Sequence, residues 1–159
     1  MVSKTLVIAV DNSTECLKAM DFAFENFPTG YTYHHVHIQP RPLGSSIVGD
    51  ADAAFFARET PTEEENKQID TTKKFMYEIF APRAKAAGVE ALTVIVETDS
   101  DSSRHIAKAL CQYAEKFKAE ALVMMRHHEA AALRHSLGSV TQYCAVHNLT
   151  PVVVVPNTA

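Results

Sequence analysis

Apolar and polar residues alternate along this chain in a pattern that predicts short strands separated by helices. Five apolar runs have the length of a strand and lie at 4–10, 31–38, 89–97, 121–125 and 152–155. Between these runs apolar residues recur at helical spacing, each time after polar residues that favour a helix start, at Asn12-Ser13, Thr62, 99–103 and Ser139. Pro82 falls inside the second helical segment and should kink or interrupt it.

This alternation predicts an α/β fold with a single domain over residues 1–159. Strands that alternate with helices connect by crossovers of one hand, so we expect an open, doubly wound parallel sheet of five strands with helices on both faces. Ligands bind to such sheets beyond the carboxyl ends of the strands. Four strand ends therefore predict one shared crevice: Asp11, 36–39, Thr98-Asp99 and 125–128.

Composition favours a soluble globular protein in a reducing compartment. The chain is 47% hydrophobic, and its net charge of −4 argues against a nucleic-acid-binding surface. Cys16, Cys111 and Cys144 are too scattered for a disulfide framework or a metal site, and we interpret them as buried thiols. No secretory start or membrane-length apolar run is present, so we expect a cytoplasmic protein without a membrane partner.

Two other segments bear on possible sites. The run His34-His35-Val36-His37 places His35 and His37 on one face of a strand, but without a third ligand at suitable spacing we expect no metal site. The stretch 41–61 has no clean period and predicts a long loop. A loop of this length in a compact domain is more often functional than idle.

The segment Leu137-Gly138-Ser139-Val140-Thr141 carries the clearest candidate chemistry. Gly-Ser at a helix start that follows a strand offers an anion several backbone N–H groups, a hydroxyl and the positive end of the helix dipole. The same two residues could serve only as an N-terminal helix cap. The residues alone leave both interpretations open.

Several segments, in order, resemble the universal stress protein family across essentially the whole chain. Val10-Asp11-Asn12-Ser13 is similar to the family's Val-Asp-Gly-Ser turn, and His35-Val36 is similar to the His-Val that ends its second strand. The segment 137–141 matches the family's loop, and 150–155 is similar to its closing strand. The resemblance implies a flavodoxin-like, Rossmann-like sheet in the order 3-2-1-4-5.

The resemblance also implies a nucleotide site. In nucleotide-binding relatives the turn with the Asp contacts adenosine, the Val after His flanks adenine, and the Gly-Ser helix start holds phosphates. Carried over to this chain, these roles fall to Val10, Asp11, Val36, His127, Gly138, Ser139, Val140 and Thr141. The implied ligand is ATP or AMP, with Mg²⁺ only alongside ATP. Structural roles stay open as well, since Asp11 could cap a helix, Val36 could be core, and Thr141 could bond within its helix.

The loop departs from the family's Gly-x2-Gly-x9-Gly-Ser/Thr pattern. The spacing fits, but Met125 and His128 stand at the first two glycines, and one branch of the family that lacks these glycines does not bind ATP. The two substitutions are costly if relatives use glycine there for positive φ or for close approach of phosphate. Basic and protonatable side chains nearby could instead bind phosphate through charge-assisted hydrogen bonds: Arg126, His127, His128, Arg134 and His135.

Two functions are compatible with this pattern. The first is an adenine-nucleotide-binding stress-response regulator, and the alternative is a ligand-free, dimerising interaction module of the same family in which Met125 and His128 close the old site. Hydrolase, Walker A and dinucleotide motifs are absent, so we expect no enzyme activity beyond the weak ATP hydrolysis seen in some relatives. A regulatory protein of unknown identity is the expected partner.

The last apolar run predicts how the chain associates. Val152 to Val155 lies between Pro151 and Pro156, and an uncovered apolar edge strand invites pairing with another chain. Relatives dimerise through this strand. We therefore expect a two-fold homodimer through residues 151–156.

Overall fold

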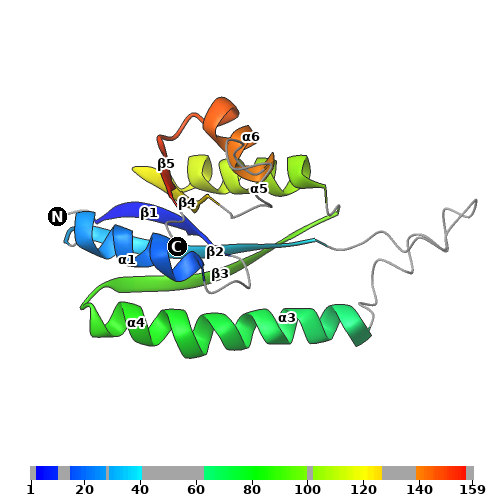
Figure 1. The fold of residues 1–159 in the computed structure, drawn as a ribbon, viewed down its shortest axis with the longest axis horizontal. Coiled ribbons are helices and arrows are strands. Elements are labelled where there is room, and N and C mark those ends of the chain that lie inside the picture. The colour runs from blue at the N-terminus through cyan, green and yellow to red at the C-terminus, as the bar shows by residue number, and fades with distance from the viewer. Residues whose placement is uncertain are drawn as a thin grey trace, which may run out of the picture.

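A five-stranded parallel sheet forms the centre of the molecule (Figure 1). The structure, a computed structural model, describes residues 3–10, 15–27, 29–40, 63–99, 102–126 and 139–156. The strands are β1 (Lys4–Ala9), β2 (Tyr31–Pro40), β3 (Glu90–Thr98), β4 (Ala121–Met125) and β5 (Val152–Val155). Their order is β3-β2-β1-β4-β5 and every neighbouring pair is parallel, which confirms the predicted fold class and strand order.

Helices cover both faces of this sheet (Figure 1). One face carries α1 (Cys16–Asn26) and a long helical segment that consists of α3 (Glu63–Phe75), η1 (Met76–Phe80) and α4 (Ala81–Ala86), whereas the other carries α5 (Ser103–Lys116) and α6 (Ser139–His147). Successive side chains of a strand point to opposite faces. Thus Leu6 and Ile8 of β1 pack with α1, while Val7 packs with α5.

The long helical segment changes its winding just before Pro82. Proline has no N–H to donate, and its ring crowds the carbonyl four residues earlier. The chain accommodates this with the π-helical turn η1, where the Ala81 N–H donates to the carbonyl of Met76, five residues back. The interruption predicted at Pro82 is therefore confirmed, as a wider turn in a continuing helix.

The three cysteines are buried free thiols, as predicted. Cys111 of α5 and Cys144 of α6 face each other with their Sγ atoms 3.6 Å apart. Burial raises the pKa of both thiols. They act here as small apolar side chains that join the two helices.

The strands end at unequal heights along the carboxyl edge of the sheet. The pairing of β1 with β2 ends at Ala9 and Val36, whereas the pairing of β2 with β3 continues to Pro40 and Thr98. β2 thus extends past the predicted end at residue 38. The last residues of β2 stand beyond the end of β1 and form one wall of the space described below.

His35 is a buried polar side chain in the middle of β2. It has no solvent exposure, and neither ring nitrogen has a hydrogen-bond partner. Its ring packs edge-on against Phe80 of η1, with 5.2 Å between the ring centroids. Burial, and secondarily the neighbouring His34, lower the pKa of His35 to about 4. The ring is therefore neutral at neutral pH and packs as an aromatic core residue.

No described helix is both long and apolar enough to cross a membrane. The described ranges also contain no group of three or more His, Cys, Asp or Glu side chains that could hold a metal ion. His37, which shares a face with His35, instead bonds to a backbone carbonyl and to Gln39.

Acidification should weaken the fold through His35. Because its pKa is lowered from 6.5 to about 4 in the folded chain, the unfolded chain binds the proton more readily between these two values. This contribution to stability is complete above pH 6.5 and is lost as the pH falls toward 4, by about 3 kcal/mol. Urea unfolding at a series of pH values across this window measures the loss.

The variant His35→Leu separates this effect from the titration of surface carboxylates. It should match the wild type at neutral pH, since it removes two unpaired buried nitrogens, and it should lose the His35 part of the pH dependence. His147→Gln changes an exposed histidine and serves as the matched control. A stability difference between His35→Leu and the wild type that is the same at every pH would show that this account is wrong.

Candidate functional site

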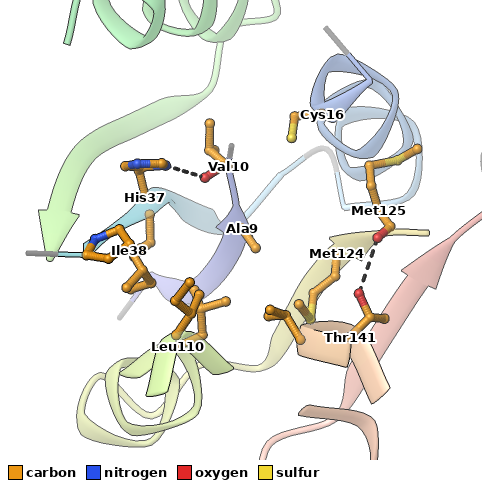
Figure 2. Close-up of a pocket in the computed structure, with 13 residues that line it drawn as sticks. Ala9, Val10, Cys16, His37, Ile38, Leu110, Met124, Met125 and Thr141 are labelled. Carbon is orange, nitrogen blue, oxygen red and sulfur yellow. Dashed lines mark hydrogen bonds between the residues drawn. The ribbon is translucent and has the colours of Figure 1, made fainter. Parts of the chain in front are cut away.

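A cavity of about 320 Å³ lies at the carboxyl edge of the sheet, where β1 and β4 stand side by side (Figure 2). α1, the next described element after β1, lies on one face of the sheet, and α6, the next after β4, lies on the other (Figure 1). Such a switch point leaves a crevice that no crossover helix fills. The cavity is lined by Ala9, Val10, Cys16, Val36, His37, Ile38, Pro40, Ile106, Leu110, Met124, Met125, Val140 and Thr141.

Apolar side chains make up most of this lining. Val36 and Ile38 contribute from β2, Ile106 and Leu110 from α5, and Met124 from β4. Valine, isoleucine and leucine offer flat, rigid surfaces, while the methionine thioether adapts to the shape of what it meets. The cavity is therefore suited to a flat apolar or aromatic group.

The two side chains in the cavity with strong hydrogen-bonding groups both bond to strand ends (Figure 2). His37 Nδ1 lies 2.8 Å from the carbonyl oxygen of Val10, and its Nε2 lies 3.1 Å from Oε1 of Gln39. The hydroxyl of Thr141 donates to the carbonyl of Met125 over 3.4 Å. Both groups thus satisfy backbone carbonyls at the ends of β1 and β4.

The structure brings together four of the residues predicted for the site. Val10, Val36, Val140 and Thr141 all line the cavity, although they come from distant parts of the chain. Ser139 begins α6 and is exposed, next to the lining but outside it. The remaining predicted site residues, Asp11, His127 and Gly138, lie outside the described residues, as does the predicted loop 41–61.

Comparison with known proteins gives the chain its family. The profile of the universal stress protein family matches residues 3–156. The chain belongs to the universal stress protein family. Comparison with curated proteins gives no match.

Solved universal stress proteins share its fold at low identity. Universal stress protein UspA from Lactobacillus plantarum has a TM-score of 0.69 and 15% identity, over 98% of this chain and 99% of the other. A universal stress protein in complex with cAMP gives 0.57 and 22%, over 99% and 100%. The universal stress protein from Archaeoglobus fulgidus in complex with dAMP gives 0.59 and 17%, over 97% and 98%.

Met125, at the first glycine position of the family loop, is the last residue of β4. It is only 3% exposed and packs with Val155, Leu6 and Ile8. Lys118 is the one described non-glycine residue with positive φ, so the backbone at Met125 is unstrained. The possible cost of a positive φ at this glycine position therefore does not arise at Met125. Met125 is part of the cavity lining, while its side chain belongs to the core cluster on the α1 face of the sheet.

One expectation about the crevice was wrong. Thr98 ends β3 and Asp99 follows it, and neither residue lines the cavity. They border a separate groove of about 760 Å³ between β3 and α5, together with Leu92 and His105. β3 is the edge strand, two places from β1, and α5 packs between its end and the cavity.

Part of the apolar lining was not predicted from the sequence, namely Ala9, Pro40, Ile106, Leu110 and Met124. Ile106 and Leu110 belong to the buried stripe of α5, and no pattern distinguishes a stripe residue beside a cavity from one in the core. The predicted strand end 36–39 does reach the cavity through Val36, His37 and Ile38, but the hydrogen bond of His37 to the Val10 carbonyl was not predicted. A signal was available for it, because a polar side chain just past the end of the neighbouring strand can bond to a carbonyl there.

Loss of the Thr141 hydroxyl should destabilise the protein modestly. Thr141 is 2% exposed, so Thr141→Val leaves the Met125 carbonyl with one bond fewer at nearly constant side-chain volume. We expect a loss of about 1 kcal/mol in the free energy of unfolding. Urea unfolding of the purified variant gives this value.

Thr71→Val is a matched control for that measurement. The Thr71 hydroxyl also donates to a backbone carbonyl, that of Lys67, but at an exposed position. Water replaces such a bond at little cost. Equal losses in the two variants would contradict a structural role for the Thr141 hydroxyl at the end of β4.

Proposed function

We propose that this universal stress protein binds an adenine nucleotide in the cavity and acts as a stress-response regulator. The observation that carries the proposal is the meeting of Val10, Val36, Val140 and Thr141 around one cavity at the switch point of the sheet. These residues come from three distant segments of the chain, at 10, 36 and 140–141, and each matches a family position. A cavity unrelated to the family's ligand site would not be expected to have all four in its lining.

The apolar half of the cavity fits a nucleobase. A purine is flat and presents two apolar faces, and the lining offers Val36, Ile38 and Leu110 as apolar surface for one of them. Small-molecule sites span about 300 to 1,000 Å³, and 320 Å³ is at the low end of that range. The size favours a nucleoside monophosphate over ATP.

The start of α6 fits the phosphate of such a ligand. α6 runs from Ser139 to His147, and the backbone N–H groups of its first turn have no partner within the helix. These groups, the Ser139 hydroxyl and the helix dipole together attract an anion. The complexes of solved relatives with cAMP and dAMP support a monophosphate ligand. Mg²⁺ would enter only with ATP.

Binding without covalent chemistry is the activity we propose. Apart from Cys16, His37 and Thr141, the cavity lining consists of side chains without a polar atom other than thioether sulfur. His37 and Thr141 already bond to backbone carbonyls. The output is then a change at the carboxyl edge of the sheet that a partner protein recognises, in the cytoplasm.

Two observations favour the alternative of a ligand-free module. Thr141 directs its hydroxyl to the Met125 carbonyl, and Met125, which stands at the first loop-glycine position, is part of the cavity lining. Function would then depend on protein contacts alone. The binding experiment below separates the two proposals.

A homodimer through β5 is compatible with both. β5 is an edge strand, and next to it Val146 and Leu149 are 70% and 86% exposed. The carbonyls of Pro151 and Val155 accept from Leu122 and Arg126, so the backbone of Val154 faces the open edge. A two-fold axis would pair this edge with that of a second copy.

Isothermal titration with AMP, cAMP and ATP, the last with and without Mg²⁺, tests the nucleotide proposal. Nucleotide-stripped wild type should bind AMP or cAMP with micromolar affinity and ATP less tightly. Ser139→Ala removes one donor to the phosphate and should weaken binding about fivefold to tenfold. Gly138→Val should weaken it as well, because a side chain there opposes close approach of phosphate.

Ser103→Ala is the matched control, since Ser103 is the first residue of α5 as Ser139 is of α6. It should bind nucleotide like the wild type. No heat with any nucleotide at millimolar concentration would refute the binding proposal and leave the ligand-free module.

Val154→Pro tests the dimer. Proline removes the N–H that faces the open edge while the bonds of Pro151 and Val155 to β4 remain. The variant should sediment as a monomer at micromolar concentration, and Val154→Ala, which keeps the N–H, should sediment as a dimer. A wild type that is itself monomeric under these conditions would disprove the β5 interface.

A further inference from the structure

The carbonyl of Val10 stands where β1 has ended and β2 continues. The last β1 residue paired with β2 is Ala9, opposite Val36, and the Val10 N–H still donates to the Val36 carbonyl over 2.9 Å. Val10 is 5% exposed, so its own carbonyl needs a partner within the protein. The imidazole of His37 supplies it, with Nδ1 2.8 Å from the oxygen (Figure 2).

The chemistry of this contact determines the position of one proton. A carbonyl oxygen only accepts, so His37 Nδ1 carries the hydrogen and donates it. On the other side of the ring, Nε2 is 3.1 Å from Oε1 of Gln39, whose side chain is 6% exposed. With the proton on Nδ1 the neutral ring accepts at Nε2, so the Gln39 amide bonds to it when its NH₂ group, and not its oxygen, faces the ring. The ring is thus held from two sides, and its orientation is defined by both contacts.

We infer that His37 is a positioning residue for the ligand site, which fixes the Val10 carbonyl and with it the point where the chain leaves β1. Val10 and His37 both line the cavity, and Val10 directly precedes the predicted adenosine contact Asp11. His37 acts on the ligand through Val10, and not through a contact of its own. The inference rests on the proposed nucleotide site for its effect on binding, but not for its effect on the backbone.

The decisive comparison is between His37→Phe and His37→Asn. Phenylalanine keeps a ring and removes the donor, whereas the amide nitrogen of asparagine stands at nearly the same distance from the backbone as Nδ1 and can donate to the Val10 carbonyl. We expect His37→Phe to weaken AMP binding about tenfold, as the loss of one buried hydrogen bond implies. His37→Asn should restore it to within about threefold of the wild type.

His34→Phe is the matched control on the same strand. His34 lies on the other face of β2, where its Nδ1 is 2.8 Å from the hydroxyl of Tyr113, and it does not line the cavity. This variant should bind AMP like the wild type. An equal loss in His34→Phe, or a failure of His37→Asn to recover binding, would overturn the inference.

Amide hydrogen exchange followed by mass spectrometry gives a readout without nucleotide. In His37→Phe, peptides that contain Val10 should exchange about tenfold faster than in the wild type, and His37→Asn should reverse this. Peptides from β5 should be unchanged. If the wild type binds no nucleotide, the proposed function fails while this exchange pattern still supports the positioning role. Unchanged exchange at Val10 in His37→Phe refutes that role whatever binds.

Discussion

The early end of β1 is the constraint on which the rest of this structure depends. β1 is the central strand, and it stops at Ala9 while β2 continues to Pro40. The strand order of the parallel sheet reverses at β1, so the helices that follow β1 and β4 lie on opposite faces of the sheet. Neither helix therefore covers the carboxyl ends of these two strands. Because β1 ends early, the space between the ends of β1 and β4 is a cavity, and side chains beyond the end of β1 line it. α1 and α6 both begin at this edge, so two helix N-termini lie near the same space.

The sequence predicted most of the fold because its patterns are local. The bounds of β4 and β5 agree with the structure because each apolar run is short and is bounded by polar residues or proline. The end of β2 was misplaced because Pro40 was taken as a stop. Pro40 nevertheless pairs with Thr98, since an extended backbone suits proline where the ladder needs no N–H from it.

The site was harder to predict because a sequence pattern does not distinguish an apolar residue that lines a cavity from one that lies in the core. Val10, Val36, Val140 and Thr141 were found through their resemblance to family positions, but Ile106, Leu110 and Met124 have the pattern of ordinary core residues. The periodicity of apolar residues indicates only which side chains face away from bulk water. Side chains in the wall of a cavity face away from it as core side chains do. Thr98-Asp99 was assigned wrongly because a strand end joins the crevice only if its strand lies close to the switch point.

A cavity whose polar side chains are already hydrogen-bonded to backbone carbonyls offers a ligand few polar contacts, so it selects ligands mainly by shape. His37 and Thr141 satisfy strand-end carbonyls, and a ligand that competed for them would leave those carbonyls unpaired. For the proposed nucleotide, selectivity would then come from the apolar walls and from the start of α6.

The π turn before Pro82 has a consequence for how the long helical segment meets the sheet. Its fully buried residues fall at every fourth position, Thr72, Met76, Phe80 and Ala84. In a regular α-helix a step of four residues overshoots one turn by about 40°, so the last of these residues would have drifted by about 120° from the first. The wider turn at 76–80 takes up that excess rotation. One stripe of side chains can therefore contact the sheet along the whole helical segment. Buried residues spaced four apart, in place of the usual alternation of three and four, are the sign of this π turn.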